Sequence, residues 1–256
     1  MFFSKKMLVA ACLLAALQGG AQRFPEHSTA PQTLNKGNAI LVNFALGTHL
    51  PKRDLAKRFG QDGNLGMGLE WMSEGYNFII GVSGSYLFGQ KVNEDPLAIL
   101  RTPEGDIIAN DQTLASVFLR QRGFYIGGHL GRLFSIASDR SGIRITAGAG
   151  MLSHKIRLQD DNRSVPMLSG DYIKGFDRLT RGFTLHQFIG WQHLAKNRRA
   201  NWFVGIDMMQ GFTRNVRSWD YNDMRRHDES RRDFRFGMVI GWTLPFYLGE
   251  GTEIEY

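Results

Sequence analysis

The sequence predicts an all-β membrane protein: an eight-stranded antiparallel transmembrane β-barrel, an up-and-down meander with long extracellular loops. Eight segments after residue 38 alternate apolar with small or polar residues, and a period of two is typical of strands. The connections between these segments are alternately short and long, as in bacterial outer-membrane barrels. The apolar rows carry almost no charge, so they suit lipid better than water.

Each expected strand sets an apolar row against a small or polar row. In the first, residues 39–49, Ile40, Val42, Phe44 and Leu46 alternate with Asn43, Ala45, Gly47 and His49. The others follow in order at residues 65–71, 78–88, 124–131, 143–151, 183–192, 202–208 and 234–244. A tilted strand crosses a bilayer in about nine to eleven residues, which is close to the length of these segments.

The lengths of the connections set the expected orientation. Joins around residues 74–77, 135–142 and 196–200 are short, whereas those around 50–64, 89–122, 155–181 and 213–232 are long. Because outer-membrane barrels have short periplasmic turns, both termini are expected in the periplasm. In the second long loop, apolar runs at 97–100 and 107–109 flank a turn-forming stretch at 103–106, which predicts a β-hairpin extending above the membrane.

Aromatic residues favour the same orientation, because barrels carry aromatic girdles at both membrane interfaces. The alternative is that aromatic residues are common in strands generally. Arg132 falls on the lipid face near the inner rim, where a long side chain can reach the headgroups. The expected outer girdle holds Phe88, Phe124, Phe183, Phe212 and Phe234, and the inner one holds Trp71, Phe78, Phe134, Trp191, Trp202 and Trp242.

The N-terminus reads as a secretory signal peptide, residues 1–21. Lys5 and Lys6 precede an apolar run at 7–17, and Gly19 and Ala21 offer a small-residue cleavage site. A lipoprotein signal at Cys12 is the alternative, but apolar residues 13–17 would then begin the mature protein. Cleavage after Ala21 leaves about 235 residues without cysteine, so neither disulfides nor thiolates hold the fold together.

The remaining chain divides into three parts by composition. Residues 22–38 would form a periplasmic N-terminal segment, 39–248 the outer-membrane barrel, and 249–256 an acidic periplasmic tail. On the same side, the turn containing Lys196, Arg198 and Arg199 is positive, so turn and tail are possible contacts for a periplasmic protein. The acids of the tail are Glu250, Glu253 and Glu255.

An eight-stranded barrel is just wide enough for its own side chains to fill it, so a general diffusion pore is not expected. Charges on the lumen face should pair with one another, because an unpaired buried charge is costly. Those nearest mid-membrane should be Glu70, His129 and Asp207, with His154, His186 and Arg235 nearer the outer opening. The expected lumen polar network is Glu70, His129, Arg144, His154, His186, Asp207 and Arg235.

Catalysis at the outer opening is the competing hypothesis for these polar residues. His154 and His186 fall on adjacent strands. A histidine with a serine or acid partner can provide the base and the nucleophile of a catalytic site. However, Ser153 points to lipid by alternation, and no nucleophile elbow, metalloprotease motif or phosphate loop occurs. We therefore expect a protein that is not an enzyme, with no catalytic, cofactor-binding or metal site.

The charge distribution indicates lipid partners. The chain has a net charge of +7 at pH 7, and the long loops together carry about +4. Such loops would attract the phosphates of lipopolysaccharide, so outer-membrane lipids and lipopolysaccharide are expected partners. Nucleic acid is not an expected partner, because the basic residues are dispersed and mixed with acidic ones.

Three stretches resemble a family of small outer-membrane barrels from Bacteroidota. They are Arg122-Gly-Phe-Tyr-Ile-Gly-Gly-His-Leu-Gly-Arg-Leu-Phe134, Gly170-Asp-Tyr-Ile-Lys-Gly-Phe-Asp-Arg-Leu-Thr180 and Pro245-Phe-Tyr-Leu-Gly-Glu250. Barrels of this kind include accessory components of the type IX secretion system, which associate with periplasmic rings and the outer-membrane translocon. The resemblance thus implies a non-enzymatic envelope anchor. The alternative is a surface barrel that binds or modifies lipopolysaccharide through its loops.

Overall fold

The structure is a computed structural model that describes residues 35–138, 140–162, 164–196 and 199–248. The expected signal peptide, most of the N-terminal segment and the acidic tail lie outside these residues. Within the described ranges, no helix is long and apolar enough to cross a bilayer.

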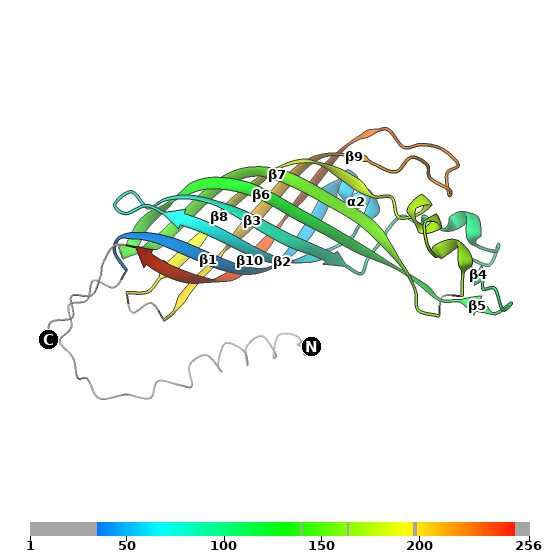
Figure 1. The fold of residues 1–256 in the computed structure, drawn as a ribbon, viewed down its shortest axis with the longest axis horizontal. Helices are drawn as coiled ribbons and strands as arrows, with labels where there is room; N and C mark the ends of the chain where they lie inside the picture. The colour runs from blue at the N-terminus through cyan, green and yellow to red at the C-terminus, as the bar shows by residue number, and fades with distance from the viewer. Residues whose placement is uncertain (1–34, 139, 163, 197–198, 249–256) are drawn as a thin grey trace, which may run out of the picture. The chain divides into compact units, whose positions relative to one another are not determined.

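Eight strands close into one antiparallel barrel in the order β1-β10-β9-β8-β7-β6-β3-β2 (Figure 1). Closure is made by β1 and β10, which pair from Asn38 with Leu248 to Arg53 with Asp233. The eight-stranded meander expected from the sequence is therefore confirmed. The barrel strands are β1 (Asn38–Arg53), β2 (Asp62–Met72), β3 (Phe78–Gly89), β6 (Val117–Ser138), β7 (Ser141–Asp160), β8 (Thr180–Leu194), β9 (Asn201–Asn215) and β10 (Ser230–Leu248).

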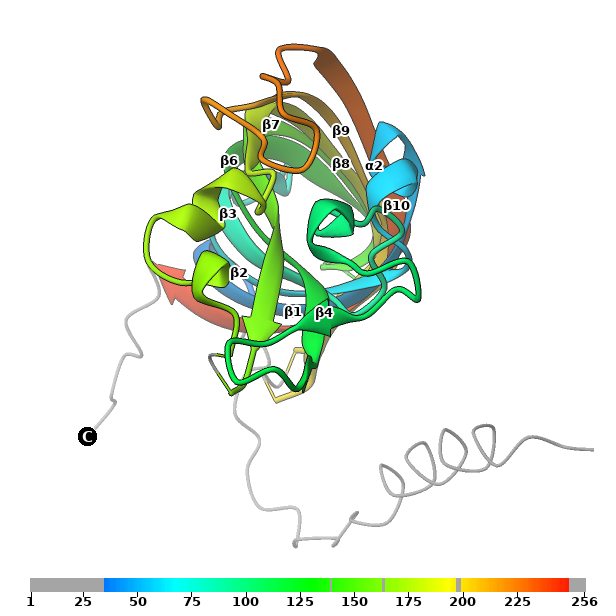
Figure 2. The ribbon, with the colours of Figure 1, turned by 90° about the vertical axis from the view of Figure 1, so that its right-hand side faces the viewer.

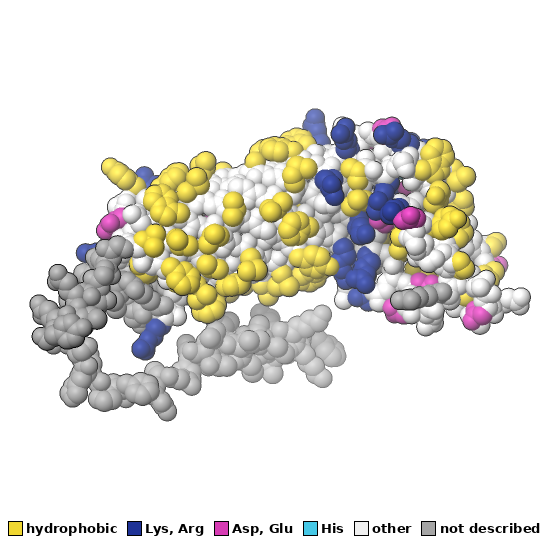
Figure 3. All heavy atoms as spheres, in the orientation of Figure 1, with side chains coloured by type: hydrophobic (Ala, Val, Ile, Leu, Met, Phe, Trp, Pro, Cys, Tyr) yellow, Lys and Arg dark blue, Asp and Glu magenta, His cyan; other side chains and the backbone are white. Residues whose placement is uncertain are grey.

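The outside of the barrel is an apolar belt. Large hydrophobic side chains alternate with buried ones along every strand, and Leu46, Met67, Ile126 and Met238 are each more than half exposed. Figure 3 shows these side chains over the body of the barrel, with Lys and Arg gathered where the belt ends on the side of the long loops. An apolar exterior around a polar interior is the pattern of a transmembrane barrel.

The two ends of the barrel differ in their connections. At one end, the short-turn end, compact turns join β2 to β3, β6 to β7 and β8 to β9. In the first of these turns Gly75 has φ 77°, a conformation that glycine adopts without steric cost. At the other end, the loop end, lie α2 (Asp54–Arg58) and the longer connections at 90–116, 161–179 and 216–229.

The strands extend further toward the loop end than the sequence suggested. The connection expected at 50–64 is reduced to α2 and three further residues, because β1 continues to Arg53 and β2 begins at Asp62. Similarly, β6 and β7 stay paired as far as Val117 and Asp160. Beyond the apolar belt both strand faces can be polar, so hydrophobic alternation fades while backbone pairing continues.

The prediction of a β-hairpin that extends above the membrane in the second long loop is wrong. Residues Ala98–Leu100 form a 3-10 helix, η1, and the second apolar run, β4 (Ile107–Ile108), pairs instead with β5 (Leu114–Ala115). Two further 3-10 helices, η2 (Pro166–Leu168) and η3 (Tyr172–Gly175), lie in the third long loop. Leu97 and Ile107 of these runs are buried in a hydrophobic cluster, whereas Ile99 and Ile108 are more than half exposed.

Both ends of the lumen are closed by apolar side chains. The floor, at the short-turn end, consists of Ala39, Leu41, Met72, Ile79, Leu133 and Leu194. The cap, at the loop end, joins α2 to the loops, which cross the opening of the barrel in Figure 2. Its buried members are Leu55, Phe59, Leu97, Ile107, Ile156, Leu158, Val165, Leu168 and Phe176.

Candidate functional site

Just above the floor, a first polar network crosses the lumen. Glu70 accepts hydrogen bonds from His129 Nε2 at 2.8 Å and from Arg144 Nη2 at 2.5 Å. From Arg144 the network continues to Gln192, and then through Thr243 to Asn43. These six side chains come from β1, β2, β6, β7, β8 and β10, so the network ties six of the eight strands together.

A second polar network lies closer to the loop end, around Asp207. Both His186 and His49 contact its carboxylate, and His49 Nε2 lies 2.9 Å from Oδ2. Arg235 donates to His49 Nδ1 at 2.6 Å, so this nitrogen is the acceptor. Arg235 also pairs with Asp62 at 2.9 Å. This network adds a second set of cross-links within the lumen.

His154 belongs to neither network. Its Nε2 lies 2.9 Å from Asp233 Oδ2, and Thr213 donates to the same oxygen at 2.5 Å. A catalytic hydroxyl would bond to the histidine rather than to the acid. The imidazole is buried, and the ring of Phe59 packs against it edge-on at 5.6 Å. The geometry brings no nucleophile to His154, and it places His186 deeper than expected, beside Asp207.

Between the two networks lies a cavity of about 90 Å³. Its lining residues include six buried atoms without a hydrogen-bond partner among the described residues: Asn43 Nδ2, Asn64 Oδ1, Glu70 Oε2, Ser85 Oγ, Tyr125 OH and Arg144 Nε. A polar space of this size accommodates a small cluster of waters. A cavity of this volume is too small to serve as a passage for solutes.

Two buried arginines fix the loops beneath the cap. Arg58 of α2 donates to Glu94 at 2.7 Å, to the hydroxyl of Thr180 at 2.7 Å and to the carbonyl of Arg178 at 3.1 Å. Arg178 also pairs with Glu94, and its Nε lies 2.8 Å from Asp220 Oδ2. Burial and the neighbouring cations Arg231 and Arg178 lower the pKa of Arg58 to about 9, which leaves it charged at neutral pH. Through Glu94 and Arg178, these contacts join all four connections at the loop end.

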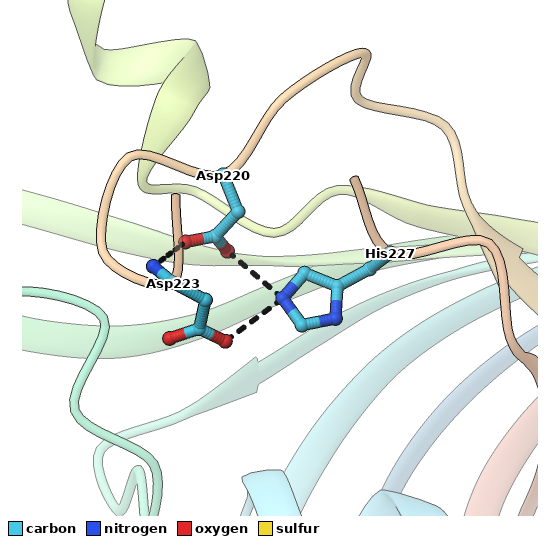
Figure 4. A group of neighbouring side chains, drawn as sticks. All are labelled: Asp220, Asp223 and His227. Carbon is cyan, nitrogen blue, oxygen red and sulfur yellow. Dashed lines mark hydrogen bonds and ion pairs between the residues drawn. The ribbon is translucent and has the colours of Figure 1, made fainter. Parts of the chain in front are cut away.

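Asp220, Asp223 and His227 form the only group among the described residues whose geometry could hold a metal ion (Figure 4). His227 Nε2 lies 2.8 Å from Asp223 Oδ2 and 3.7 Å from Asp220 Oδ2. The same two oxygens already contact Arg178, at 3.1 Å and 2.8 Å. Since the guanidinium supplies the positive charge that a cation would bring, we assign this cluster to the fixing of the loops.

A band of outward-facing cations, which we name the basic collar, encircles most of the barrel above the apolar belt. Its members lie on the outward face by strand alternation, and they span six consecutive strands from β6 round to β1. Direct cross-strand neighbours within it have the same charge: Arg120 faces Arg157, and Arg181 faces Arg214. The collar consists of Lys52, Arg120, Arg122, Lys155, Arg157, Arg181, Arg214 and Arg232.

The remaining sequence-predicted residues take the following places. Trp71, Trp202 and Trp242 are 40–52% exposed on the outward face toward the short-turn end, and Trp191 is partly buried. Lys196 and Arg199 are exposed in the turn between β8 and β9, whereas Arg198, Glu250, Glu253 and Glu255 lie outside the described residues. The outward-facing phenylalanines Phe124, Phe183 and Phe212 are each about half exposed, and Phe88 is partly buried.

Sequence reasoning missed three residues that pair with the buried polar residues it expected in the lumen. Asp62 and Asp233 pair with Arg235 and His154, but they fall in or beside stretches expected to be loops. His49 was placed on the lumen face without a partner. The signal that could have found the two acids is the alternation itself, extended beyond the apolar belt: Asp62 shares its face with Glu70, and Asp233 shares its face with Arg235.

No protein-family model matches the sequence, and no curated protein matches it. Solved structures with a similar fold include Ail of Yersinia pestis, in complex with the heparin analogue sucrose octasulfate, with a TM-score of 0.36 and 9% identity over 81% of this chain and 99% of that one. OprG from Pseudomonas aeruginosa has a TM-score of 0.36 and 14% identity over 84% and 99%. A mutant of the monoaromatic hydrocarbon channel TodX has a TM-score of 0.32 and 8% identity over 83% of this chain and 91% of that one.

Proposed function

We propose that this protein is a non-enzymatic anchor in the bacterial outer membrane, an accessory component of an envelope assembly that works through its rims rather than its lumen. The observation that carries this proposal is the closure of the lumen at every level. An apolar floor, two polar networks and an apolar cap follow one another along the axis. A barrel closed in this way does not conduct solutes.

In this proposal the short-turn end faces the periplasm, because outer-membrane barrels place their short turns there. The positive turn at Lys196, Arg198 and Arg199 and the acidic tail at 249–256 would then meet a periplasmic partner. The type IX secretion system is the assembly to test first, because the stretches at 122–134 and 170–180 resemble its accessory barrels. In the structure, these stretches lie within β6 and around η3.

The test is affinity purification of the tagged full-length protein from cross-linked cells. Reversing the charges of Lys196, Arg198 and Arg199, or deleting residues 249–256, should release periplasmic partners while the barrel still assembles, as judged by its gel shift on heating. A matched control reverses Arg225 and Arg226 at the loop end. Unchanged co-purification in both rim variants would refute the anchor role.

A second candidate function, binding of lipopolysaccharide, is favoured by the basic collar. Modification of lipopolysaccharide is not, because the described lumen histidines contact carboxylates rather than a nucleophilic hydroxyl. If modification occurred nonetheless, His154→Ala would change the lipid A mass spectrum without unfolding the barrel. An unchanged spectrum is the expected result.

A further inference from the structure

We propose that the cross-strand pairs Arg181–Arg214 and Arg120–Arg157 are binding sites for the phosphate groups of lipopolysaccharide. The inference deepens the second candidate function and names its site. In each pair, the two arginines are direct partners in the register of adjacent antiparallel strands. Their Cβ atoms are therefore about 4.5–5.5 Å apart, a spacing at which like charges destabilise a sheet.

Neither pair is neutralised from within the protein. Among the described residues, none of these four side chains makes an ion pair, whereas other exposed cations at the loop end do. Arg225, for instance, lies 3.0 Å from Glu229, and Arg226 lies 2.6 Å from Asp228. The lack of acidic partners is thus a property of these two pairs and not of the loop end as a whole.

The third cross-strand pair of the collar, Arg122 with Lys155, differs in one respect. Lys155 lies 3.5 Å from Asp177, a carboxylate that Arg217 also holds at 2.5 Å. This pair is therefore partly neutralised, so we expect it to contribute less to anion binding. It serves as an internal reference for the two pairs without an acid.

The height of the Arg181–Arg214 pair matches the headgroup layer of a membrane. Arg181 lies two residues beyond Phe183, and Arg214 lies two residues beyond Phe212, and both phenylalanines are about half exposed on the lipid-facing side. Two residues of strand span about 7 Å. Aromatic side chains mark the edge of the hydrocarbon, so the guanidiniums reach the level at which lipid phosphates lie.

The chemistry of guanidinium selects phosphate among membrane groups. Its planar fork of N–H donors fits phosphate oxygens in a bidentate manner, and one phosphate between two arginines would convert repulsion into attraction. The collar lies on the side of the long loops, which is the lipopolysaccharide leaflet if the proposed orientation holds. Lipopolysaccharide also offers more than one phosphate on a single molecule, so it can occupy neighbouring pairs.

The test measures binding of lipid A by the full-length protein refolded in neutral detergent. The probes are bis-phosphorylated lipid A, the same lipid after phosphatase treatment, phosphatidylglycerol and inorganic phosphate. The variants are R181Q/R214Q and R120Q/R157Q. The matched control, R225Q/R226Q, removes the same charge from arginines that already have acidic partners.

We expect wild type to prefer phosphorylated lipid A, and each pair variant to bind it about 25-fold more weakly, the change expected from two cations at an anionic surface. The control should bind as wild type does. The melting temperature is a second readout. In detergent alone, R181Q/R214Q should melt at a higher temperature than wild type. Once lipid A is added, it should melt at a lower temperature than wild type.

Three outcomes would overturn the proposal. Equal binding by pair variants and wild type would refute the site, even if lipopolysaccharide binding itself stood. Equal binding of phosphatidylglycerol, or equal stabilisation by inorganic phosphate, would show a general anion surface. Failure of wild type to distinguish phosphorylated from dephosphorylated lipid A would remove the second candidate function as well, and the partner purification would still decide the anchor role separately.

Discussion

The lumen and the basic collar differ in how their charged side chains are arranged. In the lumen, Glu70 is held by Arg144 and His129, and Asp207 by two histidines. In the collar, arginine faces arginine across adjacent strands. The lumen therefore balances its charges internally, whereas the collar becomes balanced only when anions arrive from outside. This difference separates the part of the molecule that holds the barrel together from the part that meets other molecules.

The largest effect should come from breaking the balance in the lumen. Glu70→Ala leaves Arg144 and His129 buried without their carboxylate, and we expect a loss of about 3–5 kcal/mol in unfolding free energy. Urea titration of the refolded barrel in detergent would measure it. The double variant Glu70→Leu with Arg144→Leu removes both charges and should lose less. A double variant as unstable as Glu70→Ala would contradict the pairing.

A smaller effect is expected where the loops are fixed. Glu94→Ala removes the shared acid of Arg58 and Arg178, and since its side chain is 29% exposed, we expect a loss of about 1–3 kcal/mol. The loss should be local: trypsin added to the refolded barrel in detergent should cut the loops while the barrel still shifts on heating. Asp161→Ala, in an exposed part of the third loop, is the control. Resistance to trypsin equal to wild type would show that the loops are fixed elsewhere.

In the collar, we expect the removal of a charge to stabilise the protein rather than destabilise it. Arg181→Gln removes a charge that faces Arg214, so we expect it to stabilise the lipid-free barrel by about 0.2–1 kcal/mol. Melting in neutral detergent at low and high salt would test this, and the gain should shrink with salt, which screens exposed charges. Destabilisation by this variant without lipid would mean that Arg181 already has a partner in the protein.

The smallest expected effect is a local loss of stability at acidic pH. Burial opposes ionisation of Asp223, but the hydrogen bond from Asn222 and the charges of Arg178 and His227 keep the pKa of its carboxyl below the ordinary value. Its stabilising contribution is therefore complete above the unfolded value near 4 and is lost as the pH falls through the lower folded value. Hydrogen exchange in residues 216–229 should increase below about pH 4, earlier than in the barrel. Uniform exchange across both regions would contradict this.

Much of the barrel could be predicted from alternation alone. The period of two placed Glu70, Arg144 and Asp207 on one face and Trp71 and Ile145 on the other, and the structure has the same faces. The alternation is strong there because one side meets lipid and the other meets packed side chains. Where both sides leave the membrane, as at Asp62 and Asp233, the hydrophobic contrast ends and the pattern no longer marks the strand.

The pairs in the collar could not have been predicted in the same way. That Arg181 lies opposite Arg214 depends on the register of β8 and β9, which is set by the turn at residues 195–200 and not by composition. The expected network also omitted contacts between strands distant in sequence, such as His49 with Asp207. Such contacts depend on which strands close the ring and on how their residues line up in depth.

The first polar network also constrains the order of assembly. Thr243 and Asn43 are 200 positions apart, and Arg144 and Glu70 are 74 apart, so none of these bonds can form within a single hairpin. Thr243 and Asn43 meet only when β1 pairs with β10, and until the sheet curls to bring β2 opposite β7, the carboxylate of Glu70 and the guanidinium of Arg144 face a forming, poorly hydrated interior without each other. Partly closed intermediates are therefore high in free energy, and insertion should proceed in a single cooperative step rather than strand by strand.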